Sequence, residues 1–233
     1  MIPNPYPGIF IAIDGIDGCG KSTQVKMLAD WLRQEIYPTP ALGSISPGRV
    51  ILETKEPNKE GRFGRMIYAD LAKHEKGLNA QDPFRFQMWY ACDSKEHLQH
   101  TVIPRLELGG IVISDRFRSS LVYGAKDRED IPNLMSMNQT IIGEHFIWPD
   151  MIFIIDVPPD VAIERLKQKG RALDGHEQIV TLARTRDYYS YFASFYPNCK
   201  PIWHEGDPSP SAKAEFIQYH VRKLLEQKPY HGV

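Results

Sequence analysis

Residues 15–22 constrain this chain more than any other stretch. They read Gly-Ile-Asp-Gly-Cys-Gly-Lys-Ser and fit the pattern G-x-x-x-x-G-K-[ST] at every fixed position. An apolar run at 10–13 precedes them and predicts a buried strand, and apolar residues with helical spacing follow. In this context the backbone N–H groups of the loop are expected to bind phosphate groups at a helix N-terminus. Lys21 would reach the β- and γ-phosphates of a nucleotide, and the Ser22 hydroxyl would ligate Mg²⁺.

The loop and the first residues of the following helix form the predicted ATP site. Its predicted members are Gly15, Asp17, Gly18, Cys19, Gly20, Lys21, Ser22 and Thr23. Cys19 has two interpretations. It is a small residue that fits the loop, which we favour, or it is a thiolate stabilised beside a helix N-terminus. The second interpretation predicts inactivation by thiol reagents, with protection by nucleotide.

The bulk properties exclude several classes of protein. A length of 233 residues suits a single α/β domain spanning 1–233, and 42% hydrophobic residues suffice for a substantial core. The 28 basic and 29 acidic residues nearly cancel, which argues against binding to nucleic acid through overall charge. No apolar run is long enough to span a bilayer, and no signal peptide is indicated. The three widely spaced cysteines suggest neither a metal site nor a disulfide framework, so a cytoplasmic location is expected.

Short apolar segments alternate with helical patterns along the chain. This alternation predicts a parallel sheet covered by helices on both faces. The predicted strands are 10–14, 49–54, 111–114, 151–156 and 201–204, and the predicted helices are 21–36, 60–74, 83–108, 133–145, 159–169, 178–196 and 211–227. Ligands of such sheets bind at the carboxyl ends of the strands. Asp14, Asp115 and Asp156 are expected at this edge.

Three charged residues follow predicted strands directly. Asp115 could hold Mg²⁺ or its waters, or act as a base near an attacking oxygen. Arg116 could bind a phosphate bidentately. The alternative, a surface ion pair, is less favoured beside a phosphate loop. Lys55 is a candidate contact for a second anionic substrate, although lysines after strands are common.

A basic segment at 165–177 joins two predicted helices. It contains Arg165, Lys167, Lys169 and Arg171. A mobile basic lid of this kind would neutralise charge on a transferring phosphoryl group and exclude water. An ordinary solvated, basic helix end fits the same pattern.

Aromatic residues gather at the start of the predicted helix 83–108. They are Phe84, Phe86, Trp89 and Tyr90. One of them could stack on a nucleobase, although aromatic residues at helical spacing more often belong to the core.

Together these motifs resemble the thymidylate kinase family of nucleoside monophosphate kinases. The opening FIAIDGIDGCGKSTQ at 10–24 resembles the start of that family almost residue for residue. TKEP at 54–57 stands where the family has T-R-E-P. The stretch 90–117 aligns without a gap to its F-A-A-D-R-x-x-H … G-x-x-V-x-x-D-R-Y pattern. Residues 149–170 resemble its P-D-L-x-x-x-L-D-V-P-P-E-x-A-x-x-R-x-x-x-R-G pattern.

The resemblance implies a fold, a reaction and a set of contacts. The fold would be a three-layer P-loop kinase fold: an α/β domain with a five-stranded parallel sheet and a short basic lid. The reaction would transfer the γ-phosphoryl of ATP, with Mg²⁺, to a deoxynucleoside monophosphate, and the enzyme would be a homodimer. The implied substrate contacts are Asp17, Lys55, Tyr90, Ser94, Arg116 and Tyr123, with Tyr90 stacking on the base. The implied catalytic residues are Lys21, Asp115, Arg116, Arg165 and Arg171, and the metal ligands are Ser22 and Asp115.

Four departures from the family pattern bear on the predicted site. Lys55 replaces an arginine, and Gly18 stands where some members carry a basic residue, which gives weight to the cations of the lid. Ser94 replaces an arginine associated with the thymine edge, and Lys95 beside it is a candidate compensation. The segment after Arg116 is one residue short and lacks the glutamine of a Tyr-Gln pair near the base. The acceptor is expected to be a deoxynucleoside monophosphate. Its first candidate is dTMP, and an altered or broadened base specificity is the alternative.

Two other classes of nucleotide-binding protein also carry a phosphate loop. A deoxynucleoside kinase would use a related phosphate loop on an uncharged acceptor, but Lys55 and Arg116 favour a monophosphate. A nucleotide-hydrolysing switch or motor would need a strand ending in Asp-Glu or Asp-x-x-Gly, and residues 156–159 offer neither.

Overall fold

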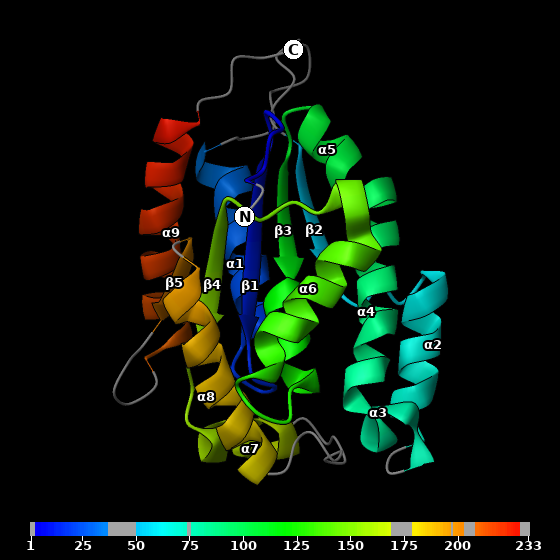
Figure 1. Cartoon of the computed structure of the whole chain (residues 1–233). Helices are drawn as coiled ribbons and strands as arrows, with labels where there is room; N and C mark the ends of the chain where they lie inside the picture. Colours follow the sequence, from blue (N-terminus) through cyan, green and yellow to red (C-terminus); the bar gives the residue numbers. More distant parts are fainter. Residues whose placement is uncertain are drawn as a thin grey trace.

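A five-stranded, all-parallel sheet forms the centre of the molecule (Figure 1). The computed structural model describes residues 3–36, 50–73, 76–168, 179–196, 198–202 and 208–228. The strands are β1 (Ile9–Gly15), β2 (Ile51–Lys55), β3 (Ile111–Asp115), β4 (Met151–Ile155) and β5 (Cys199–Ile202), in the spatial order β2-β3-β1-β4-β5. The predicted α/β fold with a five-stranded parallel sheet is therefore confirmed.

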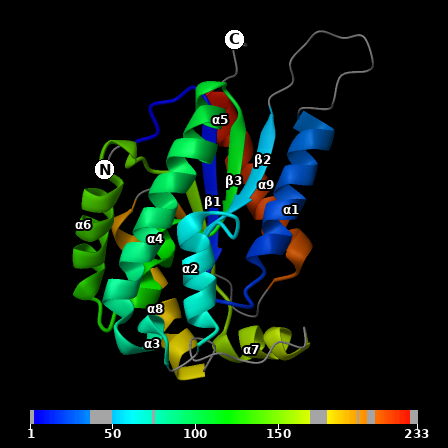
Figure 2. The same ribbon diagram turned by 90° about the vertical axis from the view of Figure 1, so that its right-hand side faces the viewer.

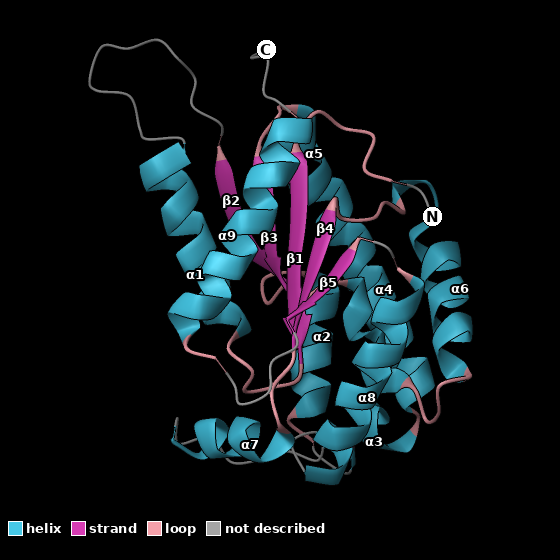
Figure 3. Cartoon of the chain, turned by 90° about the vertical axis from the view of Figure 1, so that its left-hand side faces the viewer, coloured by secondary structure: helices cyan, strands magenta, loops and turns pink. Residues whose placement is uncertain are grey.

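Helices cover both faces of this sheet, as the three-layer prediction requires. They are α1 (Lys21–Trp31), α2 (Arg62–Leu71), α3 (Leu78–Gln81), α4 (Pro83–His97), α5 (Ile103–Glu107), α6 (Asp130–Ile142), α7 (Pro159–Gln168), α8 (Ile179–Phe195) and α9 (Pro210–Gln227). Helices α1 and α9 lie on one face, and α4, α6 and α8 lie on the other (Figures 2 and 3). None of the helices in the described ranges is long and apolar enough to cross a membrane.

The strands differ in burial according to their place in the sheet. Every residue of β1 is buried, because this strand has neighbours on both sides and helices on both faces. Strand β2 lies at the edge and is only partly buried. The long apolar run of β1 follows from this central position.

The register brings polar residues to one edge of the sheet. Asp115 pairs with Ile13 of β1 and with Lys55 of β2, while Gly15 pairs with Ile155 of β4. The carboxyl ends of these strands therefore lie side by side, beside the phosphate loop. This is the edge at which ligands of parallel sheets bind.

The predicted helix 83–108 is interrupted. Helix α4 ends at His97, a π-helical turn spans Leu98–Val102, and α5 follows. Pro104 lies in the first turn of α5, and it has no N–H to donate to the preceding turn. The break therefore has a local cause.

Other differences concern short elements. Sequence periodicity missed α3 and the 3₁₀ helix η4 (Arg118–Gly124), which are too short to show a period. The last strand begins at Cys199 rather than at 201, and residues 203–204 of its predicted range lie outside the described residues. Helix α6 begins at Asp130 rather than at 133. The predicted helix 60–74 is shorter and ends at Leu71.

Asp14 ties the end of β1 to η4 and α8. Its carboxylate is completely buried and accepts hydrogen bonds from the Gly15 N–H (2.9 Å) and from hydroxyl groups of η4 and α8. These hydroxyl donors are Ser119 at 2.5 Å, Ser120 at 2.8 Å and Tyr189 at 2.7 Å. Because the donors come from β1, η4 and α8, this one side chain positions the segment that follows β3.

Asp14→Asn is expected to lower the free energy of unfolding by about 3 kcal/mol, because an amide cannot accept all of these hydrogen bonds. Urea unfolding followed by circular dichroism would measure the loss. Asp30→Asn is the matched control, since the Asp30 side chain is 40% exposed and its ion pairs within the described residues are with Lys26 and Arg33. An equal effect of both substitutions would contradict the proposed role of Asp14.

Candidate active site

The phosphate loop closes between β1 and α1 as the motif predicts. Gly18 has φ +82°, and Gly20, the N-cap of α1, has φ +102°, a region that side chains other than glycine rarely adopt. No side chain of the described residues caps α1. The N–H groups of its first turn are therefore available to bind phosphate oxygens.

Lys21 lies across this loop and is 7% exposed. Its ammonium donates hydrogen bonds to the carbonyl oxygens of Gly15 (3.1 Å) and Ile16 (2.8 Å). Asp17 lies 4.0 Å from it. The ammonium group is thus held at the phosphate loop, where the phosphate oxygens of a nucleotide would bind it.

Ser22 and Asp115 come together as predicted. The Ser22 hydroxyl donates a hydrogen bond to Oδ2 of Asp115, and the Lys55 ammonium lies 3.8 Å from the same oxygen. The other carboxylate oxygen, Oδ1, is buried and has no hydrogen-bond partner among the described residues. A buried carboxylate oxygen without a donor suits a cation, so this corner fits Mg²⁺.

Few protein ligands are available for such an ion. The described residues include no cluster of three or more histidine, cysteine, aspartate or glutamate side chains that could hold a metal. Mg²⁺ typically binds through one or two carboxylates, substrate phosphates and water. Ser22 and Asp115 match that pattern.

Arg116 follows β3 with a left-handed backbone, φ +73°. Its guanidinium pairs with Asp17 Oδ1 and donates to the Ser120 hydroxyl at 3.2 Å, which brings it next to the phosphate loop. Burial opposes the charge, but Asp17, Tyr123 and other groups outweigh it and hold the pKa of Arg116 well above its ordinary value. The residue is a permanent cation at the edge of the sheet.

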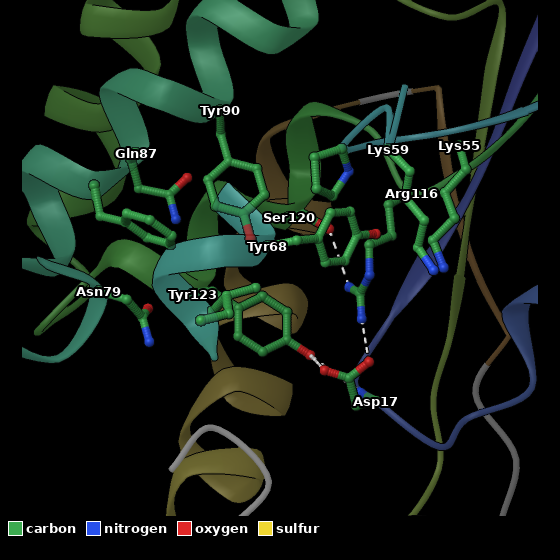
Figure 4. Close-up of a pocket in the computed structure, with 13 residues that line it drawn as sticks. Asp17, Lys55, Lys59, Tyr68, Asn79, Gln87, Tyr90, Arg116, Ser120 and Tyr123 are labelled. Carbon is green, nitrogen blue, oxygen red and sulfur yellow. Dashed lines mark hydrogen bonds and ion pairs between the residues drawn. The ribbon is translucent and has the colours of Figure 1, made fainter. Parts of the chain in front are cut away.

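A cavity of about 440 Å³ opens beside Arg116 (Figure 4). It is lined by Asp17, Lys55, Pro57, Lys59, Tyr68, Leu71, Asn79, Phe86, Gln87, Tyr90, Arg116, Ser120 and Tyr123. The cations Lys55 and Arg116 lie toward the phosphate loop, while Tyr90 and Gln87 enter from α4. The cavity therefore offers a cationic end for a phosphate and an aromatic end for a base.

Two tyrosines shape this cavity. The Tyr123 hydroxyl accepts from the Asp17 N–H (3.1 Å) and lies 3.4 Å from Asp17 Oδ2. Tyr90 packs edge-on against Phe86, with ring centroids 5.4 Å apart. Burial raises the pKa of both tyrosine hydroxyl groups, so each stays neutral at physiological pH.

The sequence of this chain also matches the sequences of known proteins. The family model described as thymidylate kinase matches residues 13–202 of this chain. The chain belongs to the thymidylate kinase family. It is therefore an ATP-dependent nucleoside monophosphate kinase.

Individual relatives agree with the family model. A thymidylate kinase of Prochlorococcus marinus is 32% identical over 187 residues, which are 80% of this chain and 81% of the relative. A probable thymidylate kinase of Thermococcus gammatolerans is 29% identical over 231 residues, which are 97% of this chain and 100% of the relative. A thymidylate kinase of a Synechococcus species is 29% identical over 223 residues, with 94% and 98% covered.

Gly18, where some members of the thymidylate kinase family carry a basic residue, has no room for a side chain here. A Cβ atom would lie 2.4 Å from the carbonyl oxygen of Ala162 in α7. Arg165, a predicted lid cation, belongs to α7 as well. Arg171 and the rest of the predicted lid from 169 lie outside the described residues.

Ser94 lies away from the large cavity. Its hydroxyl donates to Glu56 Oε1 at 3.1 Å, and His97 Nδ1 lies 3.0 Å from the same oxygen. Ser94 lines a smaller space of about 20 Å³ instead, together with Tyr90 and Gln87. The glutamate is thus the partner of Ser94 in this kinase, and a contact of Ser94 with the base stays a prediction.

Gln87 was not singled out from the sequence. It points into the cavity from α4, one helical turn before Tyr90 (Figure 4). A Cβ atom at Gly124 would lie only 2.2 Å from Gln87 Cγ. Gln87 therefore occupies the space that a side chain at position 124 would need. The sequence does contain a signal for Gln87, because it lies three positions before Tyr90 and residues at that spacing share a helix face.

Other residues of the site were also missed. They include Lys59, Tyr68, Asn79, Arg118, Ser120, Arg186 and Tyr189. Arg186 forms a bidentate ion pair with Asp156, with both N–O distances 2.5 Å, and so joins α8 to the end of β4. Asp156 at the strand edge is thus a structural carboxylate within the described part of the chain.

Gly124→Ala is expected to destabilise the kinase by about 1–3 kcal/mol, because the new methyl group overlaps Gln87. In a Gln87→Ala background the same substitution meets no Cγ atom and is expected to be nearly neutral. Urea unfolding of the four proteins gives the coupling between the two positions. Equal losses in both backgrounds would contradict the exchange of side-chain volume.

Cys19 is expected to react slowly with iodoacetamide. Burial raises the pKa of its thiol, and Lys21 and Arg116 only partly oppose this. Burial also raises the pKa of Cys92, but that residue is only half-buried, so it is expected to label first. Mass spectrometry of a Cys92→Ser variant would check this, and rapid labelling of Cys19 that ATP prevents would restore the thiolate interpretation.

Proposed function

We propose that this protein transfers the γ-phosphoryl group of ATP to dTMP and releases ADP and dTDP. The observation that carries the proposal is the cavity between the phosphate loop and α4, with cations at one end and Tyr90 at the other. A nucleoside monophosphate has the same polarity, a dianion joined to an aromatic base. The relatives of this protein are named thymidylate kinases, which supports dTMP as the acceptor.

Each end of the site has its own task. Lys55 and Arg116 would hold the acceptor phosphate, Arg116 with a planar fork and Lys55 as a point charge. Lys21 and the loop N–H groups would hold the phosphates of ATP. Holding both substrates in line contributes to the rate by removing the entropy cost of their encounter.

Mg²⁺ would be held by Ser22 and Asp115, and when bound it neutralises charge on the ATP phosphates. Lys21 stabilises charge on the transferred group from its position over the loop. Asp115 orients the Ser22 hydroxyl and lies beside Lys55. Arg165 and Arg171 remain the predicted cations of the lid.

An uncharged nucleoside is the less favoured acceptor. Three cationic side chains, Lys55, Lys59 and Arg116, line the cavity. The pKa of Arg116 is held well above its ordinary value, so its charge is permanent. A hydroxyl acceptor without phosphate would leave these charges unneutralised. No observation favours a deoxynucleoside kinase.

The remaining partner and location assignments are predictions as well. A homodimer would need an apolar surface, and the exposed Met66 on α2 and Met88 on α4 are candidates for it. Small-molecule nucleotides rather than nucleic acid or membranes are the expected ligands, and the cytoplasm is the expected location.

A coupled ADP-release assay with ATP, Mg²⁺ and each nucleoside monophosphate in turn tests the function. We expect dTMP to give the highest kcat/KM. No response to any monophosphate, with a response to thymidine, would overturn the proposal in favour of a nucleoside kinase.

Lys21→Ala is expected to lower kcat by at least ~10²-fold, the usual loss on removal of an electrostatic catalytic group. The matched control is Lys26→Ala on the same helix, because Lys26 is 72% exposed and pairs with Asp30. The control is expected to keep its activity. An active Lys21→Ala enzyme would exclude the proposed mechanism.

A further inference from the structure

Arg118 is a buried cation that the proposed mechanism does not use. It begins η4, two residues after Arg116, and is 3% exposed. Its guanidinium lies 4.0 Å from the ring centre of Phe146 and 4.6 Å from that of Phe117. Nη1 donates to the carbonyl oxygen of Ile147 at 2.6 Å. Aromatic packing and one hydrogen bond therefore fix the plane of the side chain.

Two of its nitrogens lack partners. Nε and Nη2 are buried and form no hydrogen bond within the described structure. Buried donors without acceptors are rare in folded proteins, because each loses its bonds to water and gains nothing in return. Burial lowers the pKa of Arg118 to about 9, and the attraction of Glu56 only partly opposes it. The folded state thus carries an unfavourable local arrangement that a ligand could relieve.

The guanidinium borders the acceptor site. Arg118 lines the space of about 20 Å³ that also contacts Ser94 and Glu56. This small space shares Gln87, Tyr90, Arg116 and Ser120 with the large cavity, so the two adjoin. Its volume suits about one water molecule or one projecting ligand atom.

Ser94 and Glu56, two other polar residues at this end, already have hydrogen-bond partners. The Ser94 hydroxyl donates to Glu56, and the same carboxylate oxygen contacts His97. Glu56 is therefore engaged by α4. Arg118 alone among these residues presents buried donors without acceptors.

We propose that Arg118 reads the base of the acceptor, donating from Nε and Nη2 to the 4-oxygen of a pyrimidine, directly or through one bridging water. The inference rests on the proposed function and names a specificity residue for it. It also places the arginine missing at Ser94 on a different element, η4, at the edge of the same space.

The chemistry of arginine sets the preference. A guanidinium has five N–H donors and no acceptor. It therefore favours the carbonyl oxygen of thymine or uracil and disfavours cytosine, whose 4-amino group is itself a donor. A site that buries donors rejects a ligand without the matching acceptor, because its polar groups then remain unpaired.

The test compares dTMP, dUMP and dCMP on the wild type and on Arg118→Met, which keeps an unbranched apolar stem. We expect kcat/KM for dTMP and dUMP to fall by roughly 10- to 100-fold, mainly through KM, the range for a lost hydrogen bond to a charged group. The value for dCMP is expected to stay unchanged, so the ratio of dTMP to dCMP collapses. The KM for ATP should not move.

Arg128→Met is the matched control, because Arg128 is exposed and pairs with Asp187. It is expected to leave all three ratios unchanged. Arg118→Lys covers the case in which the methionine variant does not fold: it keeps a buried donor but loses the planar fork, and it is expected to retain part of the dTMP preference.

Proportional losses for dTMP, dUMP and dCMP in both Arg118 variants would show a structural role only and overturn the inference. So would an unchanged selectivity. A wild-type enzyme inactive on every monophosphate would instead refute the proposed function, so the two failures are distinguishable.

Discussion

The buried carboxylate of Asp14 is the interaction on which the rest of the site depends. It stands at the end of the central strand and accepts hydrogen bonds from β1, η4 and α8. The segment after β3 is thereby fixed against the phosphate loop, and with it Arg116 and Tyr123. Without the hydrogen bonds of Asp14, the acceptor residues would not be held in a fixed position relative to the phosphate loop. Catalysis of phosphoryl transfer depends on this positioning.

The two ends of the site differ in chemistry. At the loop end, positive charge comes from Lys21, Lys55 and Arg116. The carboxylates of Asp17 and Asp115 lie between these cations and reduce the repulsion among them. At its far end the walls are aromatic and amide groups from α4. One end thus recognises what all nucleoside monophosphates share, and the other recognises what distinguishes them.

The sequence predicted the loop end well and the base end poorly, for a physical reason. Lys55 and Asp115 end strands whose carboxyl ends must meet, and Lys21 and Ser22 begin the helix after β1, so local patterns place them together. The three-residue spacing of Gln87 and Tyr90 shows that they share a helix face, but only the packing of α4 turns that face toward the cavity. The packing of η4 brings Arg118 beside Gln87, which no local pattern encodes. The break before α5 was readable from Pro104, whereas α3 and η4 are too short for periodicity.

Arg116 adopts a left-handed backbone in which glycine would be the more comfortable residue. A substitution chosen only to raise thermal stability would therefore favour the removal of a side chain that links the phosphate loop to the acceptor cavity. Stability and turnover place opposite demands on this position. Engineering guided by melting temperature alone would therefore select a more stable protein that no longer binds its substrate.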